Sequence, residues 1–192
     1  LGLEFWHNGM KQMSANKPLN NPTDANGLKF RVQNSEVLKA QMAALGGSPQ
    51  PMAFSEVYGA LQTGVVDGQE NTWSNIYGKK FFEVQDGTTE TNHGIIDYLL
   101  VTSTDWWDGL DGEIRIQLST IIAEVTEARN SESTAVNEAA KQEIIAAGGV
   151  VRQLSAAQRE NWVAAMKPVW EQFRGDVGQD IIDAAQAINA KY

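Results

Sequence analysis

Residues 27–71 read GLKFRVQNSEVLKAQMAALGGSPQPMAFSEVYGALQTGVVDGQEN, and this stretch decides the fold class. Residues 28–33 alternate apolar and polar side chains, which predicts a strand with one buried face. A helix is expected to begin after Ser35 and to end at the glycine pair that starts with Gly46. An extended segment and a second short helix, capped by Ser55, follow. This succession of strands and helices is typical of α/β proteins.

The end of this stretch combines a tight turn with a cluster of amide and carboxylate side chains. Asp67 and Gly68 form a turn signal, and Gln69, Glu70, Asn71 and Asn75 follow. We expect these groups on a loop. They bond the local backbone, as Asn and Gln near turns usually do, or a rigid scaffold presents them to a ligand. The residues alone leave both interpretations open.

The flanking sequence extends the α/β pattern. Residues 1–9 predict a short strand followed by a loop that carries Lys11, and residues 95–103 predict a strongly apolar strand. A helix over roughly 112–147 would span about 50 Å, which exceeds one small domain, so we expect it to link two packing partners. The remaining expected elements are a strand at 150–154, a helix that begins at Ser155, and a last helix at about 177–190.

Composition and charge exclude several classes of protein. The 192 residues are 42% hydrophobic and 20% charged, which indicates a folded globular chain. The net charge of −9 disfavours nucleic acid as a partner and disfavours an anionic membrane surface. No apolar run approaches the ~20 residues of a membrane-spanning helix. The absence of cysteine removes disulfides and thiolate metal sites, and no metal or cofactor is expected.

The sequence contains no convincing catalytic set. The two histidines, His7 and His93, have no second metal ligand at suitable spacing, and a structural hydrogen bond is the favoured role for each. No nucleophile elbow, phosphate loop or dinucleotide fingerprint is present. An enzyme acting on a small carboxylate, with one of the histidines as base, therefore ranks as an alternative. A protein-interaction module that uses the long helix and the Trp-rich helix after Ser155 is another.

A binding site for an anion is easier to build from these residues. Arg31 falls on the outward face of the strand at 28–33, and its guanidinium could pair with a carboxylate through two parallel hydrogen bonds. Taken singly, Arg31 and Lys11 read as surface cations, Phe54 as a core residue and Asn71 as a turn residue. Only the combination of the four supports a site.

That combination resembles a known family, the substrate-binding proteins of tripartite ATP-independent periplasmic (TRAP) transporters of the DctP type. The matching segments are FWHNGMKQM at 5–13, GLKFRV at 27–32, ALGGSPQPMAFSEVY at 44–58 and ALQTGVVDGQEN at 60–71. Downstream, TNHGIIDYLLVTSTDWWDGL at 91–110 also fits. The motifs are long and ordered, and the resemblance runs from about residue 1 to the last helix.

The resemblance implies roles for four residues. Arg31 matches the arginine that forms a bidentate salt bridge with the ligand's carboxylate, Asn71 an asparagine that bonds the same carboxylate, and Phe54 an aromatic residue that packs on the ligand. Lys11 falls where the family commonly has a second arginine. Lysine keeps the positive charge there but lacks the planar guanidinium that can bond a carboxylate through two parallel hydrogen bonds. Thr72 replaces the usual proline after Glu-Asn, which is expected to relax the loop that holds Asn71.

The resemblance also implies a fold and partners. The family fold is a type II-like periplasmic-binding-protein clamp of two α/β domains that close on the ligand. Residues 1–96 and 137–192 would form the second domain, and 97–136 would belong to the first, whose N-terminal half would precede Leu1. The implied function is periplasmic capture of an organic acid for delivery to TRAP membrane subunits. Exposed apolar surface at 95–103 and on the stripe from Ile114 to Val125 would then favour self-association or a companion N-terminal fragment.

Overall fold

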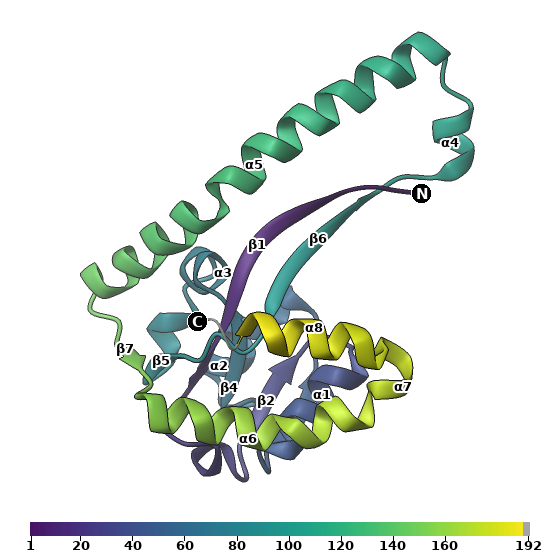
Figure 1. Cartoon of the computed structure of the whole chain (residues 1–192). Helices are drawn as coiled ribbons and strands as arrows, with labels where there is room; N and C mark the ends of the chain where they lie inside the picture. The colour runs from purple at the N-terminus through teal and green to yellow at the C-terminus, as the bar shows by residue number, and fades with distance from the viewer. Residues whose placement is uncertain (190–192) are drawn as a thin grey trace.

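The computed structural model describes residues 1–189, and one mixed β-sheet organises the chain. The strand order is β3-β2-β4-β1-β5-β7, and β6 pairs with β1 outside that path (Figure 1). The strands are β1 (Gly2–Ala15), β2 (Lys29–Val32), β3 (Ser48–Pro51), β4 (Gly68–Thr72), β5 (Gly87–Glu90), β6 (Ile95–Val101) and β7 (Val151–Gln153).

Helices occupy most of the remaining chain. The α-helices are α1 (Glu36–Ala44), α2 (Val57–Gln62), α3 (Trp73–Gly78), α4 (Thr104–Asp108), α5 (Gly112–Ala146), α6 (Ala156–Gln172), α7 (Arg174–Val177) and α8 (Gln179–Asn189). Three short 3-10 helices are η1 (Pro22–Ala25), η2 (Phe54–Glu56) and η3 (Phe81–Val84). Within residues 1–189, no helix is long and apolar enough to cross a membrane.

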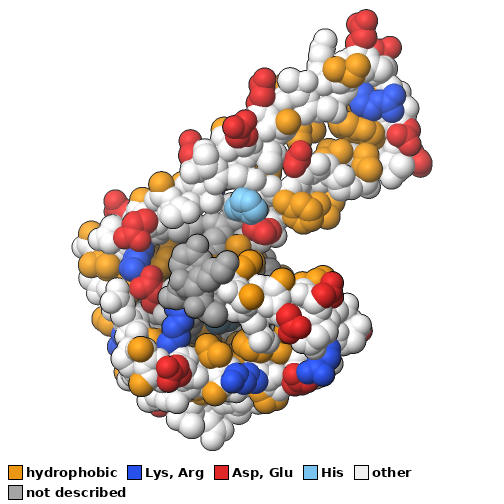
Figure 2. All heavy atoms as spheres, viewed as in Figure 1, with side chains coloured by type: hydrophobic (Ala, Val, Ile, Leu, Met, Phe, Trp, Pro, Cys, Tyr) orange, Lys and Arg blue, Asp and Glu red, His pale blue; other side chains and the backbone are white. Residues whose placement is uncertain are grey.

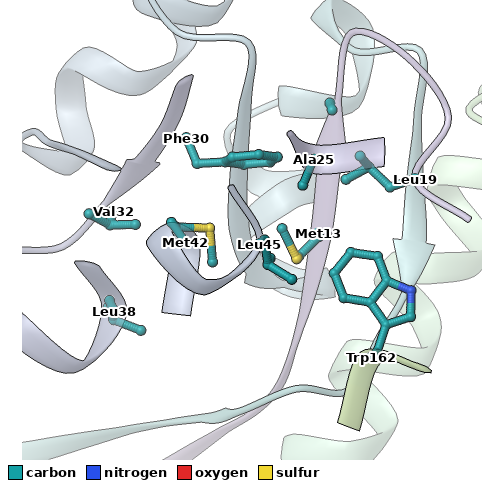
Figure 3. Close-up of a cluster of buried hydrophobic side chains, with 10 residues drawn as sticks. Met13, Leu19, Ala25, Phe30, Val32, Leu38, Met42, Leu45 and Trp162 are labelled. Carbon is teal, nitrogen blue, oxygen red and sulfur yellow. The ribbon is translucent and has the colours of Figure 1, made fainter. Parts of the chain in front are cut away.

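Both faces of the sheet are covered. Successive residues of β2 point to opposite faces, yet Phe30, Arg31 and Val32 are all buried. Phe30, Met42 of α1 and Trp162 of α6 belong to one core cluster (Figure 3). A second cluster joins α2, α3, η3 and the end of α5. The central strands are therefore held between two helical layers, as is usual for parallel pairs.

The parallel pairs bring three strand ends together. β2 runs parallel to β3 and to β4, so their carboxyl ends lie at one edge of the sheet. β1 runs antiparallel to β4, and its residue Lys11 pairs with Thr72 at the same edge. This edge carries the side chains described in the next subsection, in agreement with the general placement of ligands at the carboxyl ends of strands.

An arm extends from this body. We call residues 1–10 and 95–130 the arm; it contains the start of β1, all of β6, α4 and the first half of α5 (Figure 1). β1 pairs with β6 from Gly2 to Met10 and with β4 from Lys11 to Ala15, so one strand belongs to both parts. The predicted long helix is confirmed, and its 35 residues reach about 50 Å.

Asn137 of α5 ties the arm to the body where they meet. Its Nδ2 donates to the Asn8 carbonyl at 2.6 Å, and its Oδ1 accepts from the Ser74 backbone N–H at 3.0 Å. A Cβ on the neighbouring Gly9 would lie 2.7 Å from Asn137 Nδ2, so glycine is needed for this approach. β1, α3 and α5 are therefore joined through one amide.

Apolar side chains of the arm are exposed. Figure 2 shows hydrophobic side chains gathered on it. Phe5, Leu99 and Val101 on the ribbon of β1 and β6 are about half exposed or more, as are Ile114, Ile116 and Ile121 on α5. Soluble monomers rarely leave this much contiguous apolar surface uncovered, so the arm has the character of a contact surface.

The helix caps predicted at Ser35 and Ser155 are confirmed. Ser35 Oγ accepts from the Leu38 N–H, and Ser155 forms a reciprocal capping box with Gln158. The cap predicted at Ser55 is wrong. Ser55 lies inside η2, whose N-cap residue is Ala53, and no side chain caps that turn.

Replacing Ser155 by alanine is expected to lower the free energy of unfolding by about 1 kcal/mol, because the Gln158 backbone N–H at the start of α6 loses its acceptor, the Ser155 hydroxyl. Ser119→Ala is the matched control, since Ser119 is exposed, lies beyond the first turn of α5 and bonds only its own helix backbone at Arg115. Urea denaturation measures both. A Ser155 variant no less stable than the Ser119 variant would contradict the capping assignment.

Candidate functional site

Arg31 is buried at the end of β2, with 3% of its surface exposed. Its Nε and Nη2 atoms donate to the Met52 carbonyl at 3.0 and 2.8 Å, which fixes the guanidinium against the end of β3. The expectation that Arg31 faces outward is wrong. Alternation along β2 predicted one exposed face, but β2 lies between β3 and β4 with helices on both sides.

The charge of Arg31 has no carboxylate partner within residues 1–189. Burial lowers the pKa of the guanidinium, and the more distant charge of Glu70 acts in the opposite direction. A buried, uncompensated cation is costly, so an anion that reached it would gain unusually strong charge-assisted bonds. An open cavity of about 420 Å³ is lined by Arg31, Gln33, Pro51 and Met52.

Phe54 lies beside this guanidinium. The centre of its ring is 5.7 Å from Arg31 Cζ and 5.6 Å from Lys79 Nζ, so two cations share one aromatic ring. An edge-to-face contact with Phe81, with ring centres 5.7 Å apart, holds the ring in place. Phe54 is partly exposed and packs at the edge of the second core cluster. It therefore presents an apolar surface next to the charge of Arg31.

Asn71 lies on β4, two residues beyond the partner of Arg31. The polar cluster at 68–72 is thus a fully buried strand, and the expectation of a loop is wrong. Asn71 Oδ1 accepts from Asn75 Nδ2 at 2.7 Å and from the Thr72 backbone N–H at 3.2 Å. The proline that the family usually has at this position would lack a backbone N–H, so Thr72 supplies a hydrogen bond to Asn71 that proline could not make.

The Asn71 amide therefore has one end satisfied and one end available. Within the described chain its Nδ2 makes no hydrogen bond, although the residue is only 3% exposed. An amide nitrogen offers two donors and no acceptor. The arrangement can donate to an anion placed at the edge of the sheet.

Lys11 is part of a buried ion network. Its Nζ lies 2.5 Å from Glu70 Oε2, and both side chains are almost fully buried. His93 Nε2 lies 3.3 Å from the same oxygen, and His93 Nδ1 lies 2.7 Å from Thr91 Oγ1. The expectation of a loop around Lys11 is wrong, because β1 continues through it to Ala15. The charge of Lys11 is therefore already balanced.

The network holds Glu70 ionised. Burial alone raises the pKa of the Glu70 carboxyl, but the hydrogen bond from His93 and the charge of Lys11 outweigh it and hold the pKa below its usual range. His7, the other histidine, bonds Asp97 on the arm at 3.0 Å. Both histidines therefore lie within hydrogen-bonding distance of a carboxylate, in agreement with the structural hydrogen bond predicted for each.

The four predicted residues meet at one edge but not on one face. Strand partners share a face, so Arg31 and Asn71 lie on the face of Gln69, whereas Lys11 lies on the opposite face with Thr72 and Glu70. Arg31 and Asn71 share a face, and Phe54 lies beside the Arg31 guanidinium. The ligand-binding role predicted for Lys11 stays a prediction, and its pairing with Glu70 limits what it could contribute.

Residues 1–176 match the bacterial extracellular solute-binding proteins of family 7, DctP. The chain belongs to this family. The resemblance inferred from the sequence motifs is therefore confirmed, and so is the α/β fold class.

Family 7 relatives with curated names match almost the whole chain. The present chain is 65% identical over 190 residues to the C4-dicarboxylate-binding periplasmic protein DctP of Vibrio cholerae. The match covers 99% of this chain and 57% of the relative. The chain is 48% identical to the protein of the same name from Shewanella loihica, covering 98% and 56%. The chain thus spans a little more than half the length of these relatives.

Solved structures of family members agree with the fold. A TRAP periplasmic solute-binding protein from Shewanella oneidensis with bound succinate matches with TM-score 0.95 and 47% identity, covering 98% of this chain and 62% of that one. One from Pseudomonas aeruginosa with bound L-malate matches with TM-score 0.87 and 45% identity, covering 89% and 60%. The sheet and helices described above are those of TRAP-class solute-binding proteins.

Two contributions to the site escaped the sequence reasoning. Lys79 reaches Phe54 from the end of α3, and no pattern in the sequence signals that contact. Asn75 was noticed as part of the polar cluster without a role. The available signal was its closeness in sequence, because Asn75 lies in the first turn of α3, which directly follows the strand that carries Asn71.

Proposed function

We propose that the protein captures an organic acid in the periplasm and delivers it to the membrane subunits of a TRAP transporter, without chemical change to the acid. The observation that carries this is the buried guanidinium of Arg31, which has no carboxylate partner among residues 1–189. Membership of a solute-binding family supports the transport role.

In this proposal three side chains contact the ligand, each in a different way. Arg31 forms the salt bridge with the ligand's carboxylate, and Asn71 Nδ2 donates to the same group. Phe54 packs against the carbon skeleton beside them, because its ring lies next to the guanidinium. Lys11 acts on the ligand only at longer range, since Glu70 balances its charge.

The ligand we propose is a four-carbon dicarboxylate such as succinate or malate. The Vibrio cholerae relative is named for C4-dicarboxylates, and the Shewanella oneidensis and Pseudomonas aeruginosa structures hold succinate and L-malate. More distant family structures hold sugar acids such as β-D-galacturonate, at 30% identity. The shared carboxylate fits Arg31, and the higher identities favour the smaller acid.

Calorimetric titration of the full-length protein with succinate and with succinamide tests this proposal. Succinamide has nearly the same shape and no charge, so it leaves the guanidinium unpaired and is expected to bind at least about tenfold more weakly. Native mass spectrometry of the purified protein, followed by release of any retained acid, gives an independent identification. Equal affinity for the two compounds would overturn the carboxylate proposal.

The exposed arm supports a further part of the proposal, namely contact with another polypeptide. The half-exposed side chains of Phe5, Leu99 and Ile116 would be covered by the remainder of a two-domain clamp or by a second copy of the chain. In the domain division we propose, residues 97–136 belong to the first domain, and 1–96 with 137–192 form the second, whose strand β1 extends into the first domain through its pairing with β6.

A further inference from the structure

We propose that Asn75 is a positioning residue that orients the amide of Asn71, so that Asn71 presents a donor rather than an acceptor to the ligand. The proposal rests on the proposed function, because it assumes a carboxylate bound by Arg31. Asn75 itself does not touch the ligand in this account. It acts through Asn71, at 2.7 Å between Asn75 Nδ2 and Asn71 Oδ1.

The orientation of Asn71 follows from its neighbours. The backbone N–H of Thr72 can only donate, and it points at the Asn71 side chain with 3.2 Å between the heavy atoms. The atom facing it must therefore be Oδ1, which settles the choice that amides usually leave open. Asn75 adds the second and shorter donor to that oxygen. With Oδ1 held from two sides, Nδ2 is directed away from both donors.

This orientation matters because the wrong one would repel the ligand. An amide oxygen facing a carboxylate places two acceptors together, whereas Nδ2 supplies the donor that a carboxylate needs. Asn71 is almost fully buried and its Oδ1 already accepts two hydrogen bonds, so Nδ2 is the end of the amide that remains for a ligand. The affinity for a carboxylate over a carboxamide thus depends on which way the Asn71 amide points.

Asn75 also connects this amide to the arm. Its Nδ2 lies 3.3 Å from the hydroxyl oxygen of Tyr98 on β6, and Asn8 Nδ2 on β1 donates to the same oxygen at 2.7 Å. Asn8 Oδ1 in turn accepts from the Ser74 hydroxyl at 2.9 Å. One chain of hydrogen bonds thus runs from the ligand-facing amide to both strands of the arm, and it keeps Asn75 in its rotamer.

Asn75→Asp is the decisive variant. A carboxylate at 75 repels Asn71 Oδ1 and attracts Nδ2, so the Asn71 amide turns over and faces the ligand with its oxygen. We expect succinate affinity to fall at least tenfold, and the preference for succinate over succinamide to fall by a similar factor. Titration calorimetry of the full-length protein measures both.

Two further variants separate orientation from charge. Asn75→Leu removes the donor without adding charge, and we expect a loss of about threefold to tenfold for succinate. Asn161→Asp adds the same charge at an exposed position of α6 and is expected to stay within twofold of the unchanged protein. The side-chain amide resonances of Asn71 in ¹⁵N spectra provide a readout besides affinity. They should move in Asn75→Leu before any ligand is added.

The outcomes distinguish this inference from the proposed function. If Arg31→Ala loses succinate while Asn75→Asp keeps both affinity and preference within threefold, the carboxylate site stands and the role of Asn75 is overturned. If the unchanged protein does not prefer succinate to succinamide, the proposed function fails and this inference with it. Should Asn75→Asp not fold, unchanged Asn71 resonances and affinity in Asn75→Leu would still overturn the proposal.

Discussion

Replacing Arg31 by alanine is expected to weaken succinate binding at least about a hundredfold, close to 3 kcal/mol at equilibrium. The guanidinium is buried and has no carboxylate partner among the described residues, so it is the strongest available source of affinity for an anion. Its bonds to the Met52 carbonyl already hold it in place, which lowers the ordering cost of binding. Titration calorimetry of the full-length protein measures the loss.

Two companion variants make this test specific. Arg31→Lys keeps the positive charge but loses the planar guanidinium that can make two parallel hydrogen bonds. Its affinity for succinate should therefore fall between those of the alanine variant and the unchanged protein. Arg174→Ala removes an exposed arginine that pairs with Glu171 on the surface, and should leave affinity unaltered. An alanine variant at Arg31 within threefold of the unchanged protein would show that the carboxylate is anchored elsewhere.

The second large effect concerns stability. Glu70→Gln is expected to lower the free energy of unfolding by about 3–5 kcal/mol, because it leaves the Lys11 ammonium buried without a counter-charge. The exposed pair of Lys80 and Glu83, 3.5 Å apart, supplies the matched control, since Glu83→Gln should cost less than about 1 kcal/mol. Urea denaturation at neutral pH measures both.

A double variant tests the explanation. Adding Lys11→Met to Glu70→Gln removes the orphaned charge, so the double variant should recover much of the lost stability. If the two single losses simply added, the pair would not be the cause of the effect.

The same network gives the stability a defined pH dependence. The pKa of Glu70 in the folded protein is lowered from an ordinary value of 4.5. A carboxyl with a depressed folded-state pKa stabilises the fold fully above its unfolded-state value, and this contribution disappears as the pH falls through the folded-state pKa. The difference in stability between the unchanged protein and Glu70→Gln should therefore be constant near neutral pH and shrink below about pH 4.5.

The sequence predicted those features of the fold that depend only on residues close together in the chain. The caps at Ser35 and Ser155 and the span of α5 were all readable, because capping chemistry and glycine stops depend on neighbouring residues only. Arg31 was misplaced for the opposite reason. Its burial depends on β3, β4 and the helices that cover β2, and alternation along one strand contains no information about them.

The site was predictable in part. Arg31, Phe54 and Asn71 were identified by their resemblance to family motifs. The structure places Arg31 and Asn71 on one face of the sheet and Phe54 beside the Arg31 guanidinium, and their ligand-binding roles stay predictions. The pairing of Lys11 with Glu70 was not predictable, because the two residues are far apart in sequence and meet only through the register of β1 with β4. Register is a property of the assembled sheet.

The rigid helix α5, held at its base by Asn137, has a mechanical consequence. Asn137 bonds Asn8 on β1 and Ser74 on α3. A rotation of α5 relative to the body would therefore be centred on Asn137, close to the edge of the sheet that carries Asn71. The part of α5 between Asn137 and its start at Gly112 is ~40 Å long. A rotation of the helix by about 10° around Asn137 would therefore move Gly112 by ~7 Å. A small displacement at the contacts of Asn137 would thereby be magnified at the far end of α5.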